Sequence, residues 1–251
     1  MLSLVTSLYR SRTHLGEFLE RLRMTLDDLD TPWEILLIDD ACPEQSGVAA
    51  AELVTPGESI RILRLDRNVG QLAAIMIGLG ESRGDVVVVI DSDLQDRPED
   101  VSVLYKRLWS GDDDVVAAGR KGLYTTGLRR FTARLFRTTR AALTLGRVPR
   151  DAGLFLAARR PMIDRVLALG DPKLHLVSGL ARVGASITSV STEREPRKTG
   201  ESGYAWWQRI VLAGGALVDV TPLYPLARRN RRRRWSPPAS TSLTTSQDVE
   251  A

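Results

Sequence analysis

The sequence predicts an α/β protein built on one mainly parallel sheet with helices on both faces. Short apolar runs alternate with helix-length segments along most of the chain, as expected of such a sheet. The run Val86–Ile90 has no polar alternation, which is typical of a strand buried on both faces. Between the runs, apolar residues recur at three- and four-residue spacing, which indicates amphipathic helices.

The apolar runs define the expected strands, and the periodic segments define the expected helices. The strands are Leu2–Leu8, Glu34–Ile38, Ile60–Leu65, Val86–Ile90, Val115–Ala118, Gly153–Ala157 and Ile187–Thr192. The helices are Leu15–Leu29, Gly70–Ser82, Pro98–Ser110 and Thr125–Leu145. The third helix opens with proline followed by two acidic residues, as a first helical turn should. Residues 1–195 are therefore expected to form one domain.

The composition is that of a soluble globular protein, with 43% apolar and 26% charged residues. The net charge of +4 lies entirely in the C-terminal part. Residues 1–227 carry 29 basic and 29 acidic side chains, whereas residues 228–251 carry six and two. This distribution argues against a nucleic-acid-binding fold. The single cysteine, Cys42, excludes an internal disulfide, and no secretory signal is visible, so we expect a cytoplasmic protein.

Two further segments are expected after residue 195. Residues 196–227 end in an apolar stretch, Ile210–Ala227, whose Asp219 and prolines favour an amphipathic, interfacial segment over a membrane span. Residues 228–251 form a basic tail, and from Ser236 onward they lack the apolar surface that offsets ordering entropy, which predicts disorder. The arginine cluster indicates docking on an anionic membrane surface; a solvated basic end is the alternative.

Two carboxylate pairs follow buried strands, which is where open α/β sheets bind ligands. Asp39 and Asp40 end one strand, and Asp91-Ser92-Asp93 ends another. Asp93 and the amide oxygen of Gln95 offer the hard oxygen ligands that Mg²⁺ or Mn²⁺ prefers, and such an ion would neutralise a departing diphosphate. The alternative is that both pairs are ordinary turn formers.

The segment Asp66–Gln71 joins an expected strand to an expected helix. It is either a capped helix start, with Asn68 as the cap and Gly70 in the turn, or a nucleotide contact made by Arg67 and Asn68. Its spacing does not decide between them. The glycines of Gly78–Gly84 have the wrong spacing for a dinucleotide loop, and no phosphate-binding Gly-Lys-Ser/Thr loop exists, which argues against an NTPase.

Taken in order, these motifs resemble family 2 glycosyltransferases, and within them the polyprenyl-phosphate glycosyltransferases, the group of dolichol-phosphate mannose synthase. The similarity covers roughly residues 2–227. The match rests on Asp39-Asp40, Arg67-Asn68-x-Gly70-Gln71-x-Ala73-Ala74 and Asp91 through Glu99, with weaker support from Gly119-Arg120, Asp151–Phe155 with Arg159, and Arg197-x-x-Gly200-x-Ser202-x-Tyr204.

The resemblance implies the GT-A fold and a role for each matching residue. Asp39 would contact the nucleoside, Asp91 the ribose or sugar, and Asp93 with Gln95 the metal. The arginines expected at the phosphates are Arg120 with Arg129 or Arg130, and the residues expected on a mobile acceptor loop are Arg197 and Ser202. The remaining residues expected to bind substrate are Ser7, Tyr9, Asp40, Arg67, Asn68, Gly70, Gln71 and Ser92.

The chain departs from the family pattern in two places. The first strand of the family usually runs into Pro-x-Tyr-Asn-Glu, whereas Ser11 stands here in place of the carboxylate, which puts the choice of nucleotide in question. Many bacterial members of the group also carry two membrane spans after the acceptor loop, and none is expected here. The alternatives for a partner are a second copy of the chain or a separate membrane-spanning protein.

The sequence thus predicts an inverting transferase that moves a sugar from a nucleotide diphosphate-sugar to a polyprenyl phosphate at the inner face of the cell membrane. A phosphate acceptor is already an anionic nucleophile and needs cationic positioning rather than a general base. One alternative is a transferase that acts on a soluble or polymer-linked hydroxyl, with Asp151 as the base. Another is a non-catalytic nucleotide-sugar-binding membrane adaptor, against which the intact Asp91, Asp93 and Gln95 argue.

Overall fold

The computed structural model describes residues 1–121, 138–139, 142–144, 146–195, 214–221, 223–233 and 238–243. These residues form one eight-stranded sheet in the order β7-β5-β6-β4-β1-β2-β3-β8. The strands are β1 (Leu2–Leu8), β2 (Trp33–Asp39), β3 (Ile60–Leu65), β4 (Val86–Val89), β5 (Val115–Lys121), β6 (Ala152–Arg159), β7 (Ile187–Glu193) and β8 (Ser240–Leu243). All seven predicted strands are confirmed.

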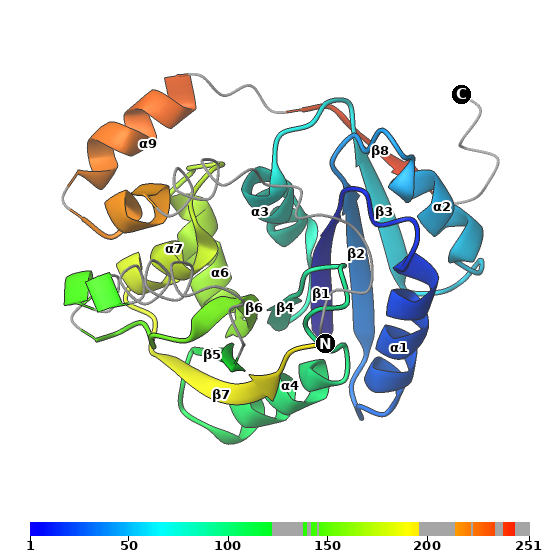
Figure 1. Cartoon of the computed structure of the whole chain (residues 1–251), viewed down its shortest axis with the longest axis horizontal. Helices are drawn as coiled ribbons and strands as arrows, with labels where there is room; N and C mark the ends of the chain where they lie inside the picture. The colour runs from blue at the N-terminus through cyan, green and yellow to red at the C-terminus, as the bar shows by residue number, and fades with distance from the viewer. Residues whose placement is uncertain are drawn as a thin grey trace.

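The helices lie on both faces of this sheet (Figure 1). They are α1 (Leu15–Asp27), α2 (Ser46–Leu53), α3 (Gln71–Glu81), α4 (Asp100–Ser110), α6 (Arg160–Ala168), α7 (Leu176–Arg182) and α9 (Tyr224–Arg233). The helices predicted in the regions of α1, α3 and α4 are confirmed, whereas most of the predicted helix Thr125–Leu145 falls outside the described residues. The short helices α2, α6 and α7 were not predicted.

The strand directions bring many chain segments to a single edge of the sheet. Strands β1 to β4 run parallel to one another, and β7 runs parallel to β5. Strand β6 lies between β4 and β5 and is antiparallel to both, so the sheet is mixed. The carboxyl ends of β1 to β5 and β7, and the amino end of β6, therefore meet along one edge, which we call the carboxyl edge.

Alternating side chains of the central strands pack into two cores. Val86 and Val88 of β4 face the core made with α1, α2 and α4, whereas Val87 and Val89 face the core made with α3, α6 and α7. All four valines are at most 3% exposed, as expected of a strand buried on both faces. The core thus fixes β4, and with it the loop that follows β4 at the carboxyl edge.

The prediction of a disordered tail is wrong for part of residues 228–251. Within it, residues 228–233 belong to helix α9, and Ser240–Leu243 form β8, which pairs antiparallel with β3. The N–H of Asp66 also donates to the carbonyl of Ala239, at 3.0 Å. A lack of apolar side chains does not exclude an added edge strand, because such a strand is held by main-chain hydrogen bonds.

Helix α9 is attached to the body by a buried ion pair. Nη1 of Arg231 lies 2.9 Å from Oδ2 of Asp171 and 2.7 Å from Oδ1 of Asp219, and both carboxylates are at most 1% exposed. At the start of the same helix, the guanidinium carbon of Arg182 lies over the ring of Tyr224, 4.1 Å from its centre. Arg231 is therefore a structural counterion rather than part of a freely solvated basic tail, whereas Arg229 on the other side of α9 is exposed.

We predict that Arg231→Met lowers the free energy of unfolding by about 3 kcal/mol, because two buried carboxylates lose their counterion. Burial already raises the pKa of Asp219, and the loss of Arg231 raises it further. A raised carboxylate pKa makes the folded state bind the proton more tightly, so the variant should regain stability between about pH 7 and pH 5. Urea unfolding at both pH values measures this, with Arg229→Met as the control; equal stabilities of the two variants would contradict it.

Candidate active site

The carboxyl edge brings together most of the residues that the sequence singled out. Ser7 and Tyr9 lie at the end of β1, Asp39 and Asp40 at the end of β2, and Asp66–Gln71 after β3. The segment Asp91–Gln95 follows β4, Gly119 and Arg120 lie in β5, and Asp151 immediately precedes β6. Segments more than a hundred residues apart in the sequence thus form one candidate site.

The loop after β4, which we call the metal loop (Asp91–Gln95), has a constrained backbone. Leu94 adopts φ = 57°, a left-handed conformation that costs a residue with a bulky side chain about 1–3 kcal/mol. Its side chain, 1% exposed, packs in the core with α1 and α4, and this anchors the loop. Oδ1 of Asp93 accepts from the N–H of Gln95 at 3.1 Å, and Nε2 of Gln71 donates to Oδ1 of Asp91 at 2.6 Å.

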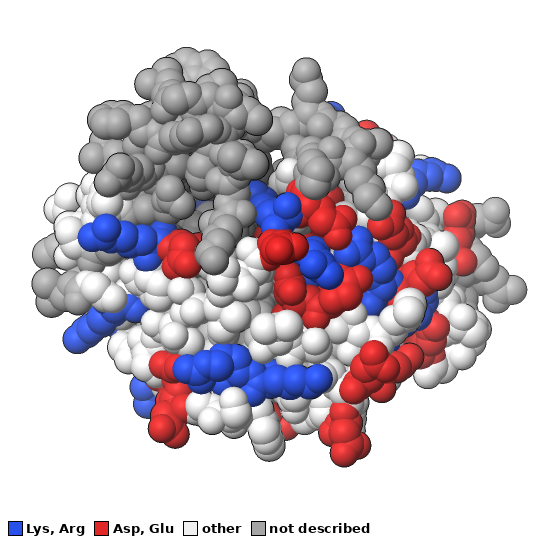
Figure 2. All heavy atoms as spheres, turned by 60° about the horizontal axis from the view of Figure 1, so that its bottom comes forward, with Lys and Arg blue, Asp and Glu red and all other residues white. Residues whose placement is uncertain are grey.

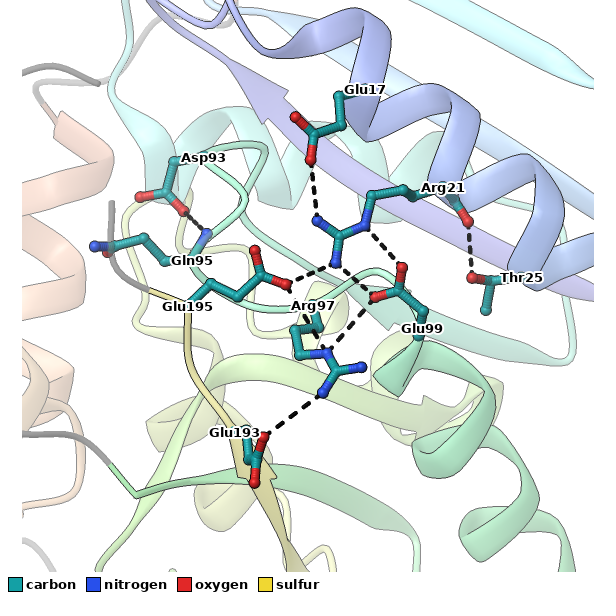
Figure 3. A network of polar contacts seen from close by, with 9 residues as sticks. All are labelled: Glu17, Arg21, Thr25, Asp93, Gln95, Arg97, Glu99, Glu193 and Glu195. Atoms are coloured by element: carbon teal, nitrogen blue, oxygen red, sulfur yellow. Dashed lines mark hydrogen bonds and ion pairs between the residues drawn. The ribbon is translucent and has the colours of Figure 1, made fainter. Parts of the chain in front are cut away.

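The side chains of the metal loop fit a divalent ion that is shared with a ligand. Figure 3 shows the carboxylate of Asp93 and the amide of Gln95 projecting toward the same side, and both residues are partly exposed. These are hard oxygen donors, as Mg²⁺ and Mn²⁺ require. Among the described residues, no group of three or more acidic, histidine or cysteine side chains is arranged to hold a metal. Two donors leave most of the coordination shell of such an ion to phosphate oxygens and water.

Ser11, the departure from the family pattern, links β1 to the metal loop. Its Oγ lies 2.8 Å from Oγ of Ser92, which in turn donates to the carbonyl of Ser7 at 3.2 Å. Ser11 and Ser92 are 3% and 6% exposed. A neutral hydroxyl pair can be buried here without a counterion, which a carboxylate at position 11 would need. Tyr9, by contrast, is 43% exposed at the rim, with the guanidinium of Arg10 5.6 Å from its ring.

The two carboxylates after β2 have different surroundings. Both oxygens of Asp40 accept main-chain hydrogen bonds, from Val69 at 2.7 Å and Gly70 at 2.9 Å, so Asp40 fixes the start of α3. Asp39 accepts from the N–H of Cys42 at 2.9 Å, while its Oδ2 is buried and makes no hydrogen bond of ordinary geometry. Burial raises the pKa of both carboxyl groups, against the main-chain donors. Asp39 is fully buried, and its contact with a nucleoside stays a prediction.

The loop between β3 and α3 contradicts the interpretation of Asn68 as the helix cap, whereas the nucleotide contact by Arg67 and Asn68 stays a prediction. Asn68 does not cap the helix, since its Nδ2 donates to the carbonyl of Asp40 at 3.0 Å. Gly70 is the N-cap residue, and its φ of 87° is a conformation that glycine adopts without strain. Arg67 is exposed, 3.6 Å from the carboxylate of Asp66. Asp40, rather than a residue of the loop itself, therefore holds the loop in place.

Asp151 lies against β5 and β7. Its Oδ1 accepts from Oγ of Ser189 at 2.9 Å, and a side chain at Gly119 would meet its Oδ2 at a distance that no real Cβ tolerates. A side chain at position 119 would thus displace the carboxylate of Asp151. The backbone of Arg120 continues β5, and its side chain lies outside the described part of the structure, as do Arg129, Arg130, Arg197 and Ser202.

Sequence reasoning missed the ion pairs around the metal loop and a cavity beside it. Arg21 and Arg97 bind several glutamates close to Gln95, and nothing in their spacing indicates this. A cavity of about 290 Å³ adjoins the start of α3. Its polar lining residues are Gln71, Lys173, His175, Asp219 and Arg231. They come from segments that only the fold brings together.

Comparison with known proteins agrees with this arrangement. Residues 3–167 match the family described as Glycosyl transferase family 2. The chain belongs to glycosyl transferase family 2. It is 34% identical to the undecaprenyl-phosphate 4-deoxy-4-formamido-L-arabinose transferase of Pseudomonas fluorescens, over 87% of this chain and 64% of the relative, and 32% identical to that of Sodalis glossinidius, over 90% and 70%. It spans about two thirds of the length of these family 2 relatives.

Solved structures show the same fold. The glucosyl-3-phosphoglycerate synthase of Mycobacterium tuberculosis, in complex with Mn²⁺, UDP and glucosyl-3-phosphoglycerate, aligns with a TM-score of 0.61 at 18% identity, covering 91% of this chain and 79% of that one. A further mycobacterial crystal structure aligns with a TM-score of 0.64 at 20% identity, covering 91% and 74%. The GT-A fold and the family expected from the sequence are thus confirmed.

We predict that Asp40→Asn destabilises the protein by about 1–3 kcal/mol, because the amide nitrogen would face a main-chain N–H and leave a buried donor unsatisfied. The start of α3 should loosen, and hydrogen exchange at Val69 and Gly70 should accelerate. Asp66→Asn is the control, since the side chain of Asp66 is exposed in the same loop. The hydrogen bond of Asp66 to Ala239 comes from its main chain and is kept in this variant. Unchanged exchange at both residues in Asp40→Asn would show that Asp40 does not hold the loop.

Proposed function

We propose that this family 2 chain is a metal-dependent, inverting glycosyltransferase that moves a sugar from a nucleotide diphosphate-sugar to a polyprenyl phosphate. One observation carries the proposal: Asp91, Asp93 and Gln95 follow the central buried strand at the same edge as Asp39 and the start of α3. A nucleotide-sugar laid along this edge would meet nucleoside-contacting residues at β2 and ligands for its diphosphate at β4. Donor, acceptor and metal all belong to the proposal.

The residues of the site have distinct tasks in this mechanism. Asp93 and Gln95 would hold Mg²⁺ or Mn²⁺, which when bound neutralises charge on the departing diphosphate. Asp91, oriented by Gln71 at 2.6 Å, would position the ribose or sugar. Asp39 would accept a hydrogen bond from the base. Inversion follows from a single displacement at the sugar C1 by an acceptor oxygen on the opposite face.

A phosphate acceptor is supported by the nature of the relatives. The relatives from Pseudomonas fluorescens and Sodalis glossinidius are named undecaprenyl-phosphate 4-deoxy-4-formamido-L-arabinose transferases, a name that specifies a lipid phosphate. Such an acceptor is already anionic, so no side chain has to remove its proton. The residues proposed to position it are Arg120 with Arg129 or Arg130, and the loop residues Arg197 and Ser202. Asp151 would then border the acceptor without acting as a base.

The outer side of α9 supports placement at the inner face of the cell membrane. Leu223 and Leu226 are 58% and 59% exposed, and Arg229 is exposed close by. Apolar side chains flanked by arginine are typical of helices that lie in the headgroup region of anionic membranes. None of the helices in the described ranges is both long and apolar enough to cross a bilayer. We therefore propose peripheral attachment through α9.

We predict that Asp93→Asn lowers sugar transfer at least a hundredfold at saturating donor, because the diphosphate loses its charge neutralisation. The assay uses UDP-, GDP- and dTDP-sugars with Mn²⁺ and a short polyprenyl phosphate, and Asp66→Asn is the control. Full activity of Asp93→Asn would remove the metal from the mechanism. If the wild-type protein binds a nucleotide-sugar but neither transfers nor hydrolyses it, the chain is a non-catalytic binder.

We predict that Asp151→Asn retains transfer to the lipid phosphate within about tenfold, since a phosphate needs no general base. The alternative, a hydroxyl acceptor with Asp151 as the base, requires the opposite result. The observation that favours this alternative is the position of Asp151, which lies half-buried at the carboxyl edge and accepts a hydrogen bond from Ser189. A loss of more than about a hundredfold, together with transfer to a water-soluble acceptor by the wild-type protein, would establish it.

We predict that Leu226→Asp combined with Arg229→Glu reduces flotation with anionic liposomes, because both changes oppose insertion beside negative headgroups. Both side chains are exposed, so the thermal stability of the protein should not change. Point changes are preferred to a truncation at Ala227, which would also remove Arg231 and β8. Equal flotation of the variant and wild type would contradict membrane attachment through α9.

A further inference from the structure

Four charged side chains lie beside the metal loop, on the side away from the carboxylate of Asp93. We call this group, Arg21, Arg97, Glu99 and Glu195, the charge clamp. Arg21 of α1 makes two parallel contacts with Glu99, at 2.7 and 2.8 Å, and a third with Oε1 of Glu195 at 2.9 Å. Arg97 adds longer contacts, 3.8 Å to Glu99 and 4.0 Å to Glu195. The clamp thus joins α1, the start of α4 and the end of β7 (Figure 3).

Arg21 is the centre of the clamp. Its side chain is only 18% exposed, while Glu99 and Glu195 are 43% and 31% exposed. The contact with Arg21 is the first cause of the lowered pKa of Glu99, and the two glutamates together raise the pKa of Arg21. A planar guanidinium can hold two carboxylates in fixed directions, which the point charge of lysine cannot do.

The clamp is connected directly to the metal loop. The N–H of Glu195 donates to the carbonyl of Gln95 at 2.9 Å. The neighbouring residues Asp96 and Arg194 form an antiparallel bridge, with their side chains 3.3 Å apart and Asp96 only 2% exposed. A shift of Glu195 would therefore move the main chain of Gln95, whose amide lies beside the carboxylate of Asp93 in Figure 3.

On the face of the molecule shown in Figure 2, acidic and basic side chains are interleaved in the middle rather than separated by sign. The carboxylates of Glu99 and Glu195 meet at the guanidinium of Arg21, and without it only the longer contacts of Arg97 would offset the repulsion between these two like charges.

We propose that Arg21 is a positioning residue for the transfer reaction: through Glu195 it holds Gln95 in the geometry that binds the metal with the diphosphate. This inference rests on the proposed function, since it assumes a metal at Asp93 and Gln95. It assigns a role in ligand binding to a residue of α1 that contacts neither the metal loop nor the ligand.

Arg23 provides a matched control on the same helix. It lies 2.8 Å from Glu58 and donates to the carbonyl of Leu53 at 2.8 Å, and its side chain is 25% exposed. It is therefore also held by an ion pair and a hydrogen bond, but to α2 and the turn after it. Loss of either arginine removes one positive charge and one set of ion pairs from α1. Only the loss of Arg21 disturbs Glu195.

The test measures Mn²⁺ binding by electron paramagnetic resonance, in parallel with UDP, GDP and dTDP, in wild-type protein and three variants. Arg21→Lys and Arg21→Met should each weaken binding of Mn²⁺ with the nucleotide about tenfold, as loss of a partner behind a metal ligand does. Arg23→Met should bind as the wild type does. Arg23→Met removes the same positive charge from α1, so weaker binding in Arg21→Met than in Arg23→Met reports lost geometry rather than lost charge.

A second variant keeps the proposal testable if Arg21→Met unfolds. Glu195→Gln should weaken binding to a similar extent, and its combination with Arg21→Lys should be no worse than the stronger single change, because both act through one contact. Wild-type binding by Arg21→Lys, or an equal loss in Arg23→Met, would overturn the role of Arg21 while leaving the proposed function intact. If the wild-type protein binds Mn²⁺ with none of the nucleotides, both proposals fail.

Discussion

Carboxylates at the ends of buried parallel strands impose the constraint on which the rest of this structure depends. Each buried carboxylate must be matched by N–H groups, by arginine or by a cation, because an unpaired charge is costly away from water. Asp40 is matched by the first N–H groups at α3, and Asp39 in part by Cys42. Asp93 lies in the loop with the left-handed Leu94, partly exposed and directed away from the ion pairs. The buried acids shape the edge, and the exposed one suits a ligand.

The same requirement explains the arginines. Arg231 is held by Asp171 and Asp219, which turns part of a basic C-terminal sequence into a packed helix. Arg21 and Arg97 match the glutamates behind the metal loop, while the exposed Arg229 is available to an anionic surface. Basic residues that look alike in sequence thus divide into structural counterions and surface charges. The division depends on which of them meet buried acids in the fold.

Much of the fold and part of the site follow from local sequence. The valine run of β4, the helical periodicities of α1 and α4, and carboxylates directly after strands are local signals, and the structure agrees with them. The short helices α2, α6 and α7 offer too few turns for a periodic pattern. Strand β8 is held by main-chain bonds to β3, which composition does not register. Contacts such as Arg21 with Glu195, 174 residues apart, arise only from the fold.

The central claim is that Asp93 holds a divalent ion together with the diphosphate of the donor. Anomalous X-ray diffraction at the manganese edge tests it most directly, on crystals grown with Mn²⁺ and whichever of UDP, GDP or dTDP binds. One strong anomalous peak is expected within about 2.5 Å of a carboxylate oxygen of Asp93, from an ion that phosphate oxygens also coordinate. A nucleotide bound at the carboxyl edge with its manganese peak elsewhere, or with none, would contradict it.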